Sequence, residues 1–381
     1  MNLDSPEEIG RADNRSMLQT CLNFPNQLED AVKLTENLVF PEEVRLKDRT
    51  VHFEKPSRIV VAGMGGSAIS GETLRGWLIG RTGIPVEVCM DYRLPSYVEG
   101  EGCLVVAVSY SGNTEETLSS FVDALRRGCM VVSVSSGGLL MNFSKRLGTP
   151  HIEVPRGLLP RLAFPYLFIP LVRTLQALEV DVDVSIEDEL QDAVKTLKDI
   201  KQTLIPESPV DSNPSKQLAL KLDGFIPAIY GFRWMKPVAE RMKGQFNENS
   251  KIPCFCNYFP SLNHNEMAGW INADSSKLFK LIMLRDPQEE PKEITNRIEL
   301  TRELLEQRLG GVIELWSRGR TRLARILSLI YIGDVASIYL AFLRGVDPYS
   351  LPSVAWVKSQ MAKRLDTPKR LEEVVDALTD E

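Results

Sequence analysis

The fold of this chain is first indicated by Arg58-Ile-Val-Val-Ala-Gly-Met-Gly-Gly-Ser-Ala68, which joins branched apolar residues to a cluster of glycines. The apolar run predicts a buried strand over Arg58–Ala62, and the pattern that follows predicts a helix over 68–79. Glycines between the two let the chain turn sharply and let backbone N–H groups approach an anion at the helix start. The segment therefore predicts a strand–turn–helix unit with an anion site at the turn.

A second segment, Ser109-Tyr-Ser-Gly-Asn-Thr114, repeats this arrangement. It follows a predicted strand over Cys103–Val108 and precedes a predicted helix over 114–127, with Thr114 as the expected N-cap. Three hydroxyls and a glycine at the positive end of a helix form an uncharged cradle for an anion. Such a cradle suits a phosphate monoester, and a dinucleotide site would not require this second loop.

Short apolar runs alternate with longer helical patterns along the rest of the chain, which is typical of parallel sheets covered by helices. Further strands are predicted over Val86–Met90, Met130–Val134, His151–Val154, Ile226–Gly231, Pro253–Tyr258, Leu278–Leu284 and Val312–Trp316. Further helices are predicted over 25–39, 138–147, 159–178, 236–247, 293–308 and 320–344, and an amphipathic segment over Val354–Leu365 precedes a charged tail. The two halves are interpreted as weak repeats of one βαβ design.

The predicted organisation is two doubly wound α/β domains with parallel sheets flanked by helices, plus a C-terminal helix. At about 150 residues per domain, 381 residues suffice for two domains. Residues 181–215 become acidic and polar and then rich in proline, which indicates a connection. We therefore place the N-terminal domain at 1–180, the connecting helix and linker at 181–215, the second domain at 216–345, and the C-terminal helix and tail at 346–381.

The composition argues against several classes of protein. A net charge of −6 without a basic stripe argues against a partner that is nucleic acid or an anionic membrane. The stretch Leu323–Leu343 is apolar, but Arg325 and Asp334 inside it favour a core helix over a membrane span. The six cysteines show no framework spacing, and residues 1–15 contain no apolar signal segment. We therefore expect reduced cysteines and a cytoplasmic location.

The glycine-rich and hydroxyl-rich segments together resemble the signature loops of sugar isomerase (SIS) domains. GMGGSAISG at Gly63–Gly71 and SYSGNTEET at Ser109–Thr117 are most similar to those of the bifunctional phosphoglucose/phosphomannose isomerase family. The resemblance extends from the helix near Pro25 to Lys358 and implies two SIS domains of flavodoxin-like topology. It also implies a pocket for hexose 6-phosphate substrates formed by Gly65, Gly66, Ser67, Ser109, Ser111 and Thr114.

The resemblance further implies reversible isomerisation of glucose 6-phosphate and mannose 6-phosphate to fructose 6-phosphate through a cis-enediolate, with no metal or organic cofactor. Glu248, within Asn247-Glu-Asn249, matches the family's glutamate, and a carboxylate partly removed from water suits a base because burial raises its pKa. Arg161 matches the family's active-site arginine and would stabilise the enediolate, with Arg156 as the nearby alternative.

Ring opening requires a second acid or base, and the chain has only three histidines that could titrate near neutral pH. His264 lies beside a helix end and a polar cluster, whereas His52 and His151 flank predicted strands without such neighbours. In the family this histidine comes from the neighbouring subunit, which implies an obligate homodimer with His264 donated across the interface.

A lysine near the C-terminus completes the set of expected catalytic residues. Lys358 follows Asp347-Pro348 and resembles the family's DP…K ending, where it would aid ring opening or bind a substrate oxygen. Lys363 is the alternative for this role.

Three other interpretations compete with the isomerase at this point. The turn at Gly63 also fits the G-x-G-x-x-A pattern of a dinucleotide-dependent oxidoreductase, with Asp91 as a ribose acceptor. A non-catalytic sugar-phosphate sensor could be built on the same fold. Cys254, Cys256 and His264 could form a zinc site, although it would lack an obvious fourth ligand.

Overall fold

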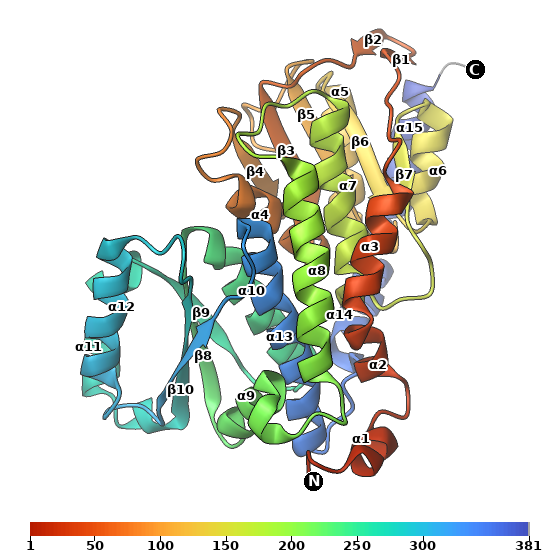
Figure 1. The fold of residues 1–381 in the computed structure, drawn as a ribbon. Coiled ribbons are helices and arrows are strands. Elements are labelled where there is room, and N and C mark those ends of the chain that lie inside the picture. Colours follow the sequence, from red (N-terminus) through yellow and green to blue (C-terminus); the bar gives the residue numbers. More distant parts are fainter. Residues whose placement is uncertain (380–381) are drawn as a thin grey trace. The chain divides into compact units, whose positions relative to one another are not determined.

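The computed structural model describes residues 1–379, which form two compact units (Figure 1). The N-half unit contains residues 27–186 and 351–379, and the C-half unit contains residues 1–26 and 187–350. Residues 1–26 thus group with the C-half unit, and residues 351–379 group with the N-half unit. The predicted connection over 181–215 contains α8 (Ile186–Leu204), which lies almost entirely in the C-half unit.

The N-half unit is built on a five-stranded parallel sheet in the order β4-β3-β5-β6-β7. Its strands are β3 (Arg58–Gly63), β4 (Val86–Cys89), β5 (Cys103–Val108), β6 (Met130–Ser135) and β7 (His151–Glu153). Its main helices are α3 (Phe24–Leu34), α4 (Gly66–Leu78), α5 (Glu115–Arg126), α6 (Gly138–Leu147), α7 (Phe164–Ala177), α14 (Pro352–Arg364) and α15 (Thr367–Leu378). Numbered along the chain, the strands are arranged 2-1-3-4-5, which is the flavodoxin-like doubly wound topology.

The C-half unit contains a four-stranded parallel sheet in the order β11-β10-β8-β9. Its strands are β8 (Ile226–Phe232), β9 (Phe255–Phe259), β10 (Phe279–Arg285) and β11 (Val312–Trp316). In Figure 1, α11 (Glu266–Asn272) and α12 (Lys292–Leu305) lie on one side of this sheet, and α10 (Lys236–Glu248) and α13 (Arg322–Leu343) lie on the other. Numbered along the chain, the order is 2-1-3-4, so this sheet has the topology of the N-half sheet without a fifth strand.

The predicted α/β class with parallel sheets flanked by helices is confirmed, and most element bounds agree within a few residues. The predicted strands Cys103–Val108 and Val312–Trp316 and the predicted helix 138–147 coincide with β5, β11 and α6. The predicted helix 159–178 is instead a short 3-10 turn, η1 (Pro160–Leu162), followed by α7. Several elements were not predicted from the sequence: α1 (Pro6–Ala12), α2 (Met17–Leu22), α9 (Pro214–Leu222), α11 and the antiparallel hairpin of β1 (Glu43–Leu46) and β2 (Arg49–His52).

The apolar helix α13 is a core element, as its two internal charges predict. It is long and apolar enough to cross a membrane, but 94% of its most apolar window is buried inside the structure. Arg325 Nε lies 2.9 Å from Asp286 Oδ1, and Arg241 Nη2 lies 2.6 Å from Asp334 Oδ2. All four side chains are buried, and pairing offsets the large cost of removing such charges from water.

The segment expected to be a charged tail is instead the helix α15, which completes the core of the N-half unit. Asp366 accepts a hydrogen bond from the backbone N–H of Lys369 at 3.4 Å at the helix start. Leu371, Val375 and Leu378 recur at helical spacing and are buried in the same cluster as residues of α5 and α6. In Figure 1, α15 lies beside α6.

This packing predicts that α15 contributes to the stability of the N-half unit. Val375→Ala removes two buried methyl groups from a fully buried position, so we expect a loss of about 2 kcal/mol. Thermal and urea unfolding measure the change. Glu373→Ala, on the exposed side of the same helix, should stay close to wild type. Equal stability of the two variants would show that α15 is not part of the core.

Candidate active site

The two glycine-rich and hydroxyl-rich loops begin side by side at the carboxyl edge of the N-half sheet. Gly63 and Val108, the last residues of β3 and β5, are paired in parallel register. The chain continues from β3 to β4 on one side and later enters β5 on the other, so the topological switch point lies between β3 and β5. Open α/β sheets bind ligands in the crevice at such a point, so this is where a ligand site is expected.

The first loop brings the start of α4 close to the segment that carries Arg161. Gly65 has φ = +52° and occupies the N-cap position of α4, where it provides no side-chain cap. A Cβ on Gly66 would lie 3.5 Å from the carbonyl oxygen of Pro160 and 3.8 Å from the Cα of Arg161. The N-terminus of α4 therefore offers an anion a positive helix end with no capping side chain.

The second loop orders hydroxyl groups at the start of α5. Ser109 Oγ and Thr114 Oγ1 lie 2.9 Å apart, and Ser111 Oγ accepts a hydrogen bond from the Asn113 N–H at 3.3 Å. Thr114 occupies the predicted N-cap position, but its hydroxyl pairs with Ser109 and does not cap the helix. This helix start is therefore also uncapped by a side chain, and it lies beside paired hydroxyls, an arrangement suited to phosphate.

A third loop, which the sequence analysis did not single out, supports the second. Ser135–Gly138 joins β6 to α6, and Ser136 donates to the Tyr110 carbonyl from both its N–H (2.9 Å) and its Oγ (2.7 Å). Gly112 has φ = +68°, and a Cβ there would lie only 1.8 Å from the Gly137 carbonyl oxygen. The sequence Ser-Ser-Gly-Gly, between a predicted strand and a predicted helix, is the signal from which this loop could have been located.

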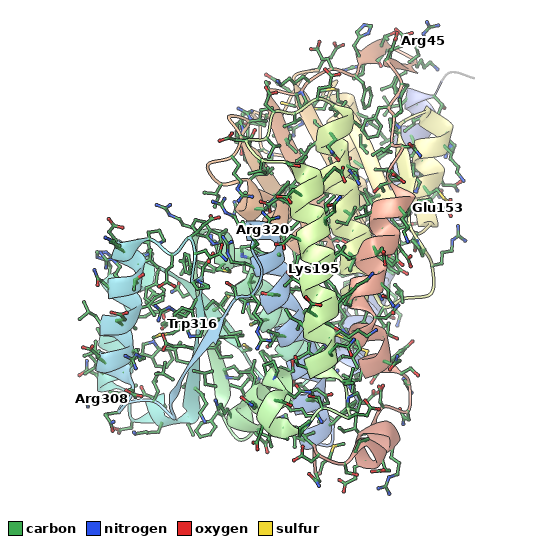
Figure 2. The ribbon with its side chains drawn as sticks, in the orientation of Figure 1. Arg45, Glu153, Lys195, Arg308, Trp316 and Arg320 are labelled. Carbon is green, nitrogen blue, oxygen red and sulfur yellow. The ribbon has the colours of Figure 1, made fainter. Side chains whose placement is uncertain are left out.

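The two candidate arginines differ in burial. Arg161, in η1, is only 6% exposed and its backbone lies next to Gly66. Arg156 is exposed, and its Nη2 lies 3.2 Å from Oε1 of Glu153, the last residue of β7 and labelled in Figure 2. A buried guanidinium is less screened than an exposed one, so this geometry favours Arg161.

Glu248 is the last residue of α10 in the C-half unit, and the turn that follows it is held firmly. Asn249 Nδ2 donates to Ser337 Oγ at 2.9 Å, and Ser250 Oγ donates to the Ser337 carbonyl at 2.6 Å. Lys251 Nζ donates to the carbonyl of Glu248 and, at 2.7 Å, to that of Ser350. The half-buried Glu248 carboxylate therefore projects from a fixed helix end, as a base that must be positioned accurately requires.

The remaining predicted catalytic residues are exposed. His264 lies in the 3-10 turn η4 (Ser261–His264) of the C-half unit, and Lys358 and Lys363 lie on α14, a helix with no buried residue. Asp347 forms a local turn by accepting hydrogen bonds from the Tyr349 N–H and the Ser350 hydroxyl, both at 2.8 Å.

The structure thus distributes the predicted site residues over both units. The N-half unit holds the loops with Gly65, Gly66, Ser67, Ser109, Ser111 and Thr114, together with Arg161 and Lys358. The C-half unit holds Glu248 and His264.

The competing zinc site does not form in the structure. Within residues 1–379, no group of three or more His, Cys, Asp or Glu side chains could hold a metal ion.

His151 is part of the N-half sheet and has hydrogen-bond partners there. Its Nδ1 lies 2.7 Å from Ser133 Oγ, and its Nε2 lies 3.4 Å from Ser135 Oγ. Burial lowers the pKa of His151 to about 4, so the ring is neutral at physiological pH. His52 is exposed, with its Nδ1 3.8 Å from Glu43 Oε2. Neither environment resembles an active site.

The buried His151 predicts a pH dependence of stability. Its native pKa of about 4 lies below the ordinary 6.5, so between these values the unfolded chain binds more protons than the native chain. Stability should therefore rise with pH across this window and should be lowest below it, where the buried ring must carry a charge.

We expect His151→Asn to make thermal stability less dependent on pH across that window. The measurement is the thermal unfolding midpoint at several pH values, for wild type and variant. His52→Asn, which changes an exposed ring, should keep the wild-type slope. If the unfolding midpoint of His151→Asn changed with pH as steeply as that of the wild type, His151 would not be the source of the pH dependence.

The sheet order and the loops at its switch point define the class of SIS-fold proteins, and comparison with known proteins gives the family. Residues 211–361 match the family described as the bacterial phospho-glucose isomerase C-terminal SIS domain. The bifunctional phosphoglucose/phosphomannose isomerase of Caldicellulosiruptor bescii is 38% identical over 355 residues, which cover 92% of this chain and 100% of that protein. The chain belongs to the bifunctional phosphoglucose/phosphomannose isomerase family, as the resemblance of its loops predicts.

Two further comparisons agree with this assignment. The protein of the same name from Aquifex aeolicus is 35% identical over 339 residues, which cover 88% of this chain and 99% of that protein. The solved structure of a glucose-6-phosphate isomerase like protein from Thermus thermophilus matches with a TM-score of 0.56 at 21% identity, and covers 91% of this chain and 95% of that chain. The structural match shows that the fold is shared.

Proposed function

We propose that this protein is an aldose–ketose isomerase that interconverts glucose 6-phosphate and mannose 6-phosphate with fructose 6-phosphate. The observation that carries the proposal is the pair of helix starts without side-chain caps at the switch point of the N-half sheet, the second of which lies beside paired hydroxyls. It occurs in a chain whose relatives, matched over most of their length, bear this name. Because the net charge is −6, the phosphate must be captured by local dipoles and hydroxyls.

The substrate is held by the loop after β3, the loop after β5 and the η1 segment that carries Arg161. The hydroxyls of Ser67, Ser109, Ser111 and Thr114 and the backbone N–H groups of Gly65 and Gly66 donate to the phosphate and sugar oxygens. Arg161 supplies a permanent positive charge for the oxygen that becomes negative in the enediolate. The interaction with Arg161 becomes stronger as the negative charge develops in the transition state. It therefore lowers the reaction barrier and does not only tighten substrate binding.

Proton transfer is assigned to Glu248. In the open-chain aldose, its carboxylate removes the proton on C2, and the electron pair of that C–H bond forms the C1–C2 double bond of the enediolate. The negative charge then lies on O1. The protonated Glu248 carboxyl gives a proton to C1, and the hydroxyl proton on O2 passes to O1, which gives the 2-ketose. The reaction is an internal redox exchange that needs no external oxidant or cofactor. C2 is trigonal in the enediolate, so glucose and mannose phosphates, which differ only at C2, share this intermediate.

Ring opening is assigned to His264, acting from the partner subunit of a homodimer, with help from Lys358. His264 is exposed on its own unit, which supports a role toward another chain. The helix α14 exposes Val354, Trp356 and Val357 at 44%, 64% and 52%, an apolar face that a second copy could cover. The six free cysteines support a reducing, cytoplasmic location.

The central test is Glu248→Gln, which keeps the size of the side chain and removes the base. Turnover of fructose 6-phosphate should fall at least a hundredfold, because general-base catalysis typically contributes that much. Coupled assays with glucose and mannose phosphates measure turnover, and D₂O exchange at C1 and C2 measures proton transfer. Glu303→Gln, an exposed change on α12, is the matched control. Wild-type turnover in Glu248→Gln would refute the assigned base.

The same assays separate the competing functions. A sensor would bind the sugar phosphate without exchanging its C1 and C2 hydrogens in D₂O. A dehydrogenase would bind NAD(H) and change its fluorescence. Glucosamine 6-phosphate, tested beside the other two sugars, reports whether the 2-hydroxyl is required.

Mixed dimers test the donation of His264 across the interface. Glu248→Gln and His264→Asn are each expected to be inactive, but a heterodimer of the two has one site with both native residues if the histidine crosses the interface. Equimolar co-refolding should then restore about a quarter of wild-type activity, since half of the dimers are mixed and each has one intact site. No recovery, with heterodimers demonstrated by a tag, would place His264 and Glu248 of the same chain together.

A further inference from the structure

A cavity of about 410 Å³ lies within the C-half unit, between one face of the sheet and the segment that contains α11. Four aromatic side chains line it: Tyr230 from β8, Phe255 from β9, Phe279 from β10 and Trp270 from α11. In Figure 1, α11 lies on the side of the sheet opposite α10 and α13. The cavity is thus lined by elements of one unit and is open to solvent, and none of the loops of the N-half unit lines it.

One carboxylate is held among these rings. The oxygens of Glu266 accept hydrogen bonds from the Tyr230 hydroxyl and from Asn257 Nδ2. Trp270 Nε1 donates to the Tyr230 hydroxyl at 2.5 Å, and the Trp270 and Phe279 rings are 5.0 Å apart in an edge-to-face arrangement. Burial, reinforced by the bond to Glu266, raises the pKa of Tyr230, so its hydroxyl stays protonated and keeps donating.

The charge of Glu266 has no counter-ion in the part of the chain that the structure describes. Within residues 1–379, no Lys, Arg or His nitrogen lies within 4.0 Å of its carboxylate, and it is the only ionised side chain that lines the cavity. A half-buried carboxylate surrounded by apolar groups is costly unless a positive charge approaches it. The face of an aromatic ring carries partial negative charge, so a lining with four such rings favours a cation as well.

We propose that this cavity is a binding site for a small organic cation of the alkylammonium class. Glu266 acts as the counter-ion, and Tyr230, Phe255, Trp270 and Phe279 form an aromatic cage around the alkyl groups on nitrogen. The charge of Glu266 makes the cavity unsuitable for a sugar phosphate, so this site is additional to the proposed catalytic function.

Two probes of equal shape test the proposal: choline and 3,3-dimethylbutan-1-ol, in which carbon replaces the charged nitrogen. Binding to the assembled wild-type protein is measured by calorimetry. Choline should bind at least about tenfold more tightly, because a desolvated cation gains from both the rings and the carboxylate. Equal binding would show a merely apolar cavity, and no binding of choline at millimolar concentration would also overturn the proposal.

Variants assign the binding to this cavity. Glu266→Gln should weaken choline binding at least about tenfold and leave the neutral alcohol unchanged. Glu299→Gln makes the same change of net charge on the exposed side of α12 and should have no effect. Phe255→Leu, at a position that is 54% exposed and so tolerant of change, should weaken choline more than the alcohol. Because Glu266→Gln also alters hydrogen bonds, Phe255→Leu keeps the proposal testable if Glu266→Gln fails to fold, and unchanged choline binding in both variants would refute it.

Discussion

The anion site depends on the close contact between two backbones, at Gly112 and Gly137. No side chain fits between them, so the second and third loops can approach until Ser136 bonds to the Tyr110 carbonyl. That contact holds the loop in which Ser109 and Thr114 pair through their hydroxyls. The pairing in turn leaves α5 without a side-chain cap, so its positive end is available to a ligand. This arrangement supports the proposal that a chain with a net charge of −6 binds a phosphate without a basic surface.

The parts of the fold that sequence analysis predicted well are those with local causes. Glycines at a strand end and hydroxyls at a helix start act through the backbone of neighbouring residues, so the two loops and their flanking elements could be located from the sequence. The composition of α15 is dominated by charged residues, so the segment was expected to be a charged tail. The buried stripe of Leu371, Val375 and Leu378 was therefore not recognised from the sequence. The loop Ser135–Gly138 was missed because its role is to contact another loop, which is a tertiary property.

Other features could not be predicted because they arise from contacts between distant segments. Arg156 and Arg161 are five residues apart in the sequence, and their different burial and the approach of η1 to Gly66 appear only in the folded chain. The terminal segments join units to which they are not adjacent in sequence because their apolar residues pack there. Phe24 and Tyr331 stack with ring centroids 5.5 Å apart, and the Tyr331 hydroxyl donates to the Leu22 carbonyl. The aromatic cavity likewise gathers residues from four separate elements.

The buried pair of Arg325 and Asp286 has a consequence for the duplicated design. Asp286 directly follows β10, and its carboxylate accepts a hydrogen bond from Trp234 Nε1, just after β8, at 2.9 Å. These two strands flank the switch point of the C-half sheet, the counterpart of the proposed phosphate site in the N-half sheet. The C-half unit thus places a carboxylate of its own at the switch point that corresponds to the proposed anion site of the N-half unit. An aspartate–arginine ion pair therefore occupies the C-half switch point, and in the proposed reaction only the N-half switch point is left to receive a substrate phosphate.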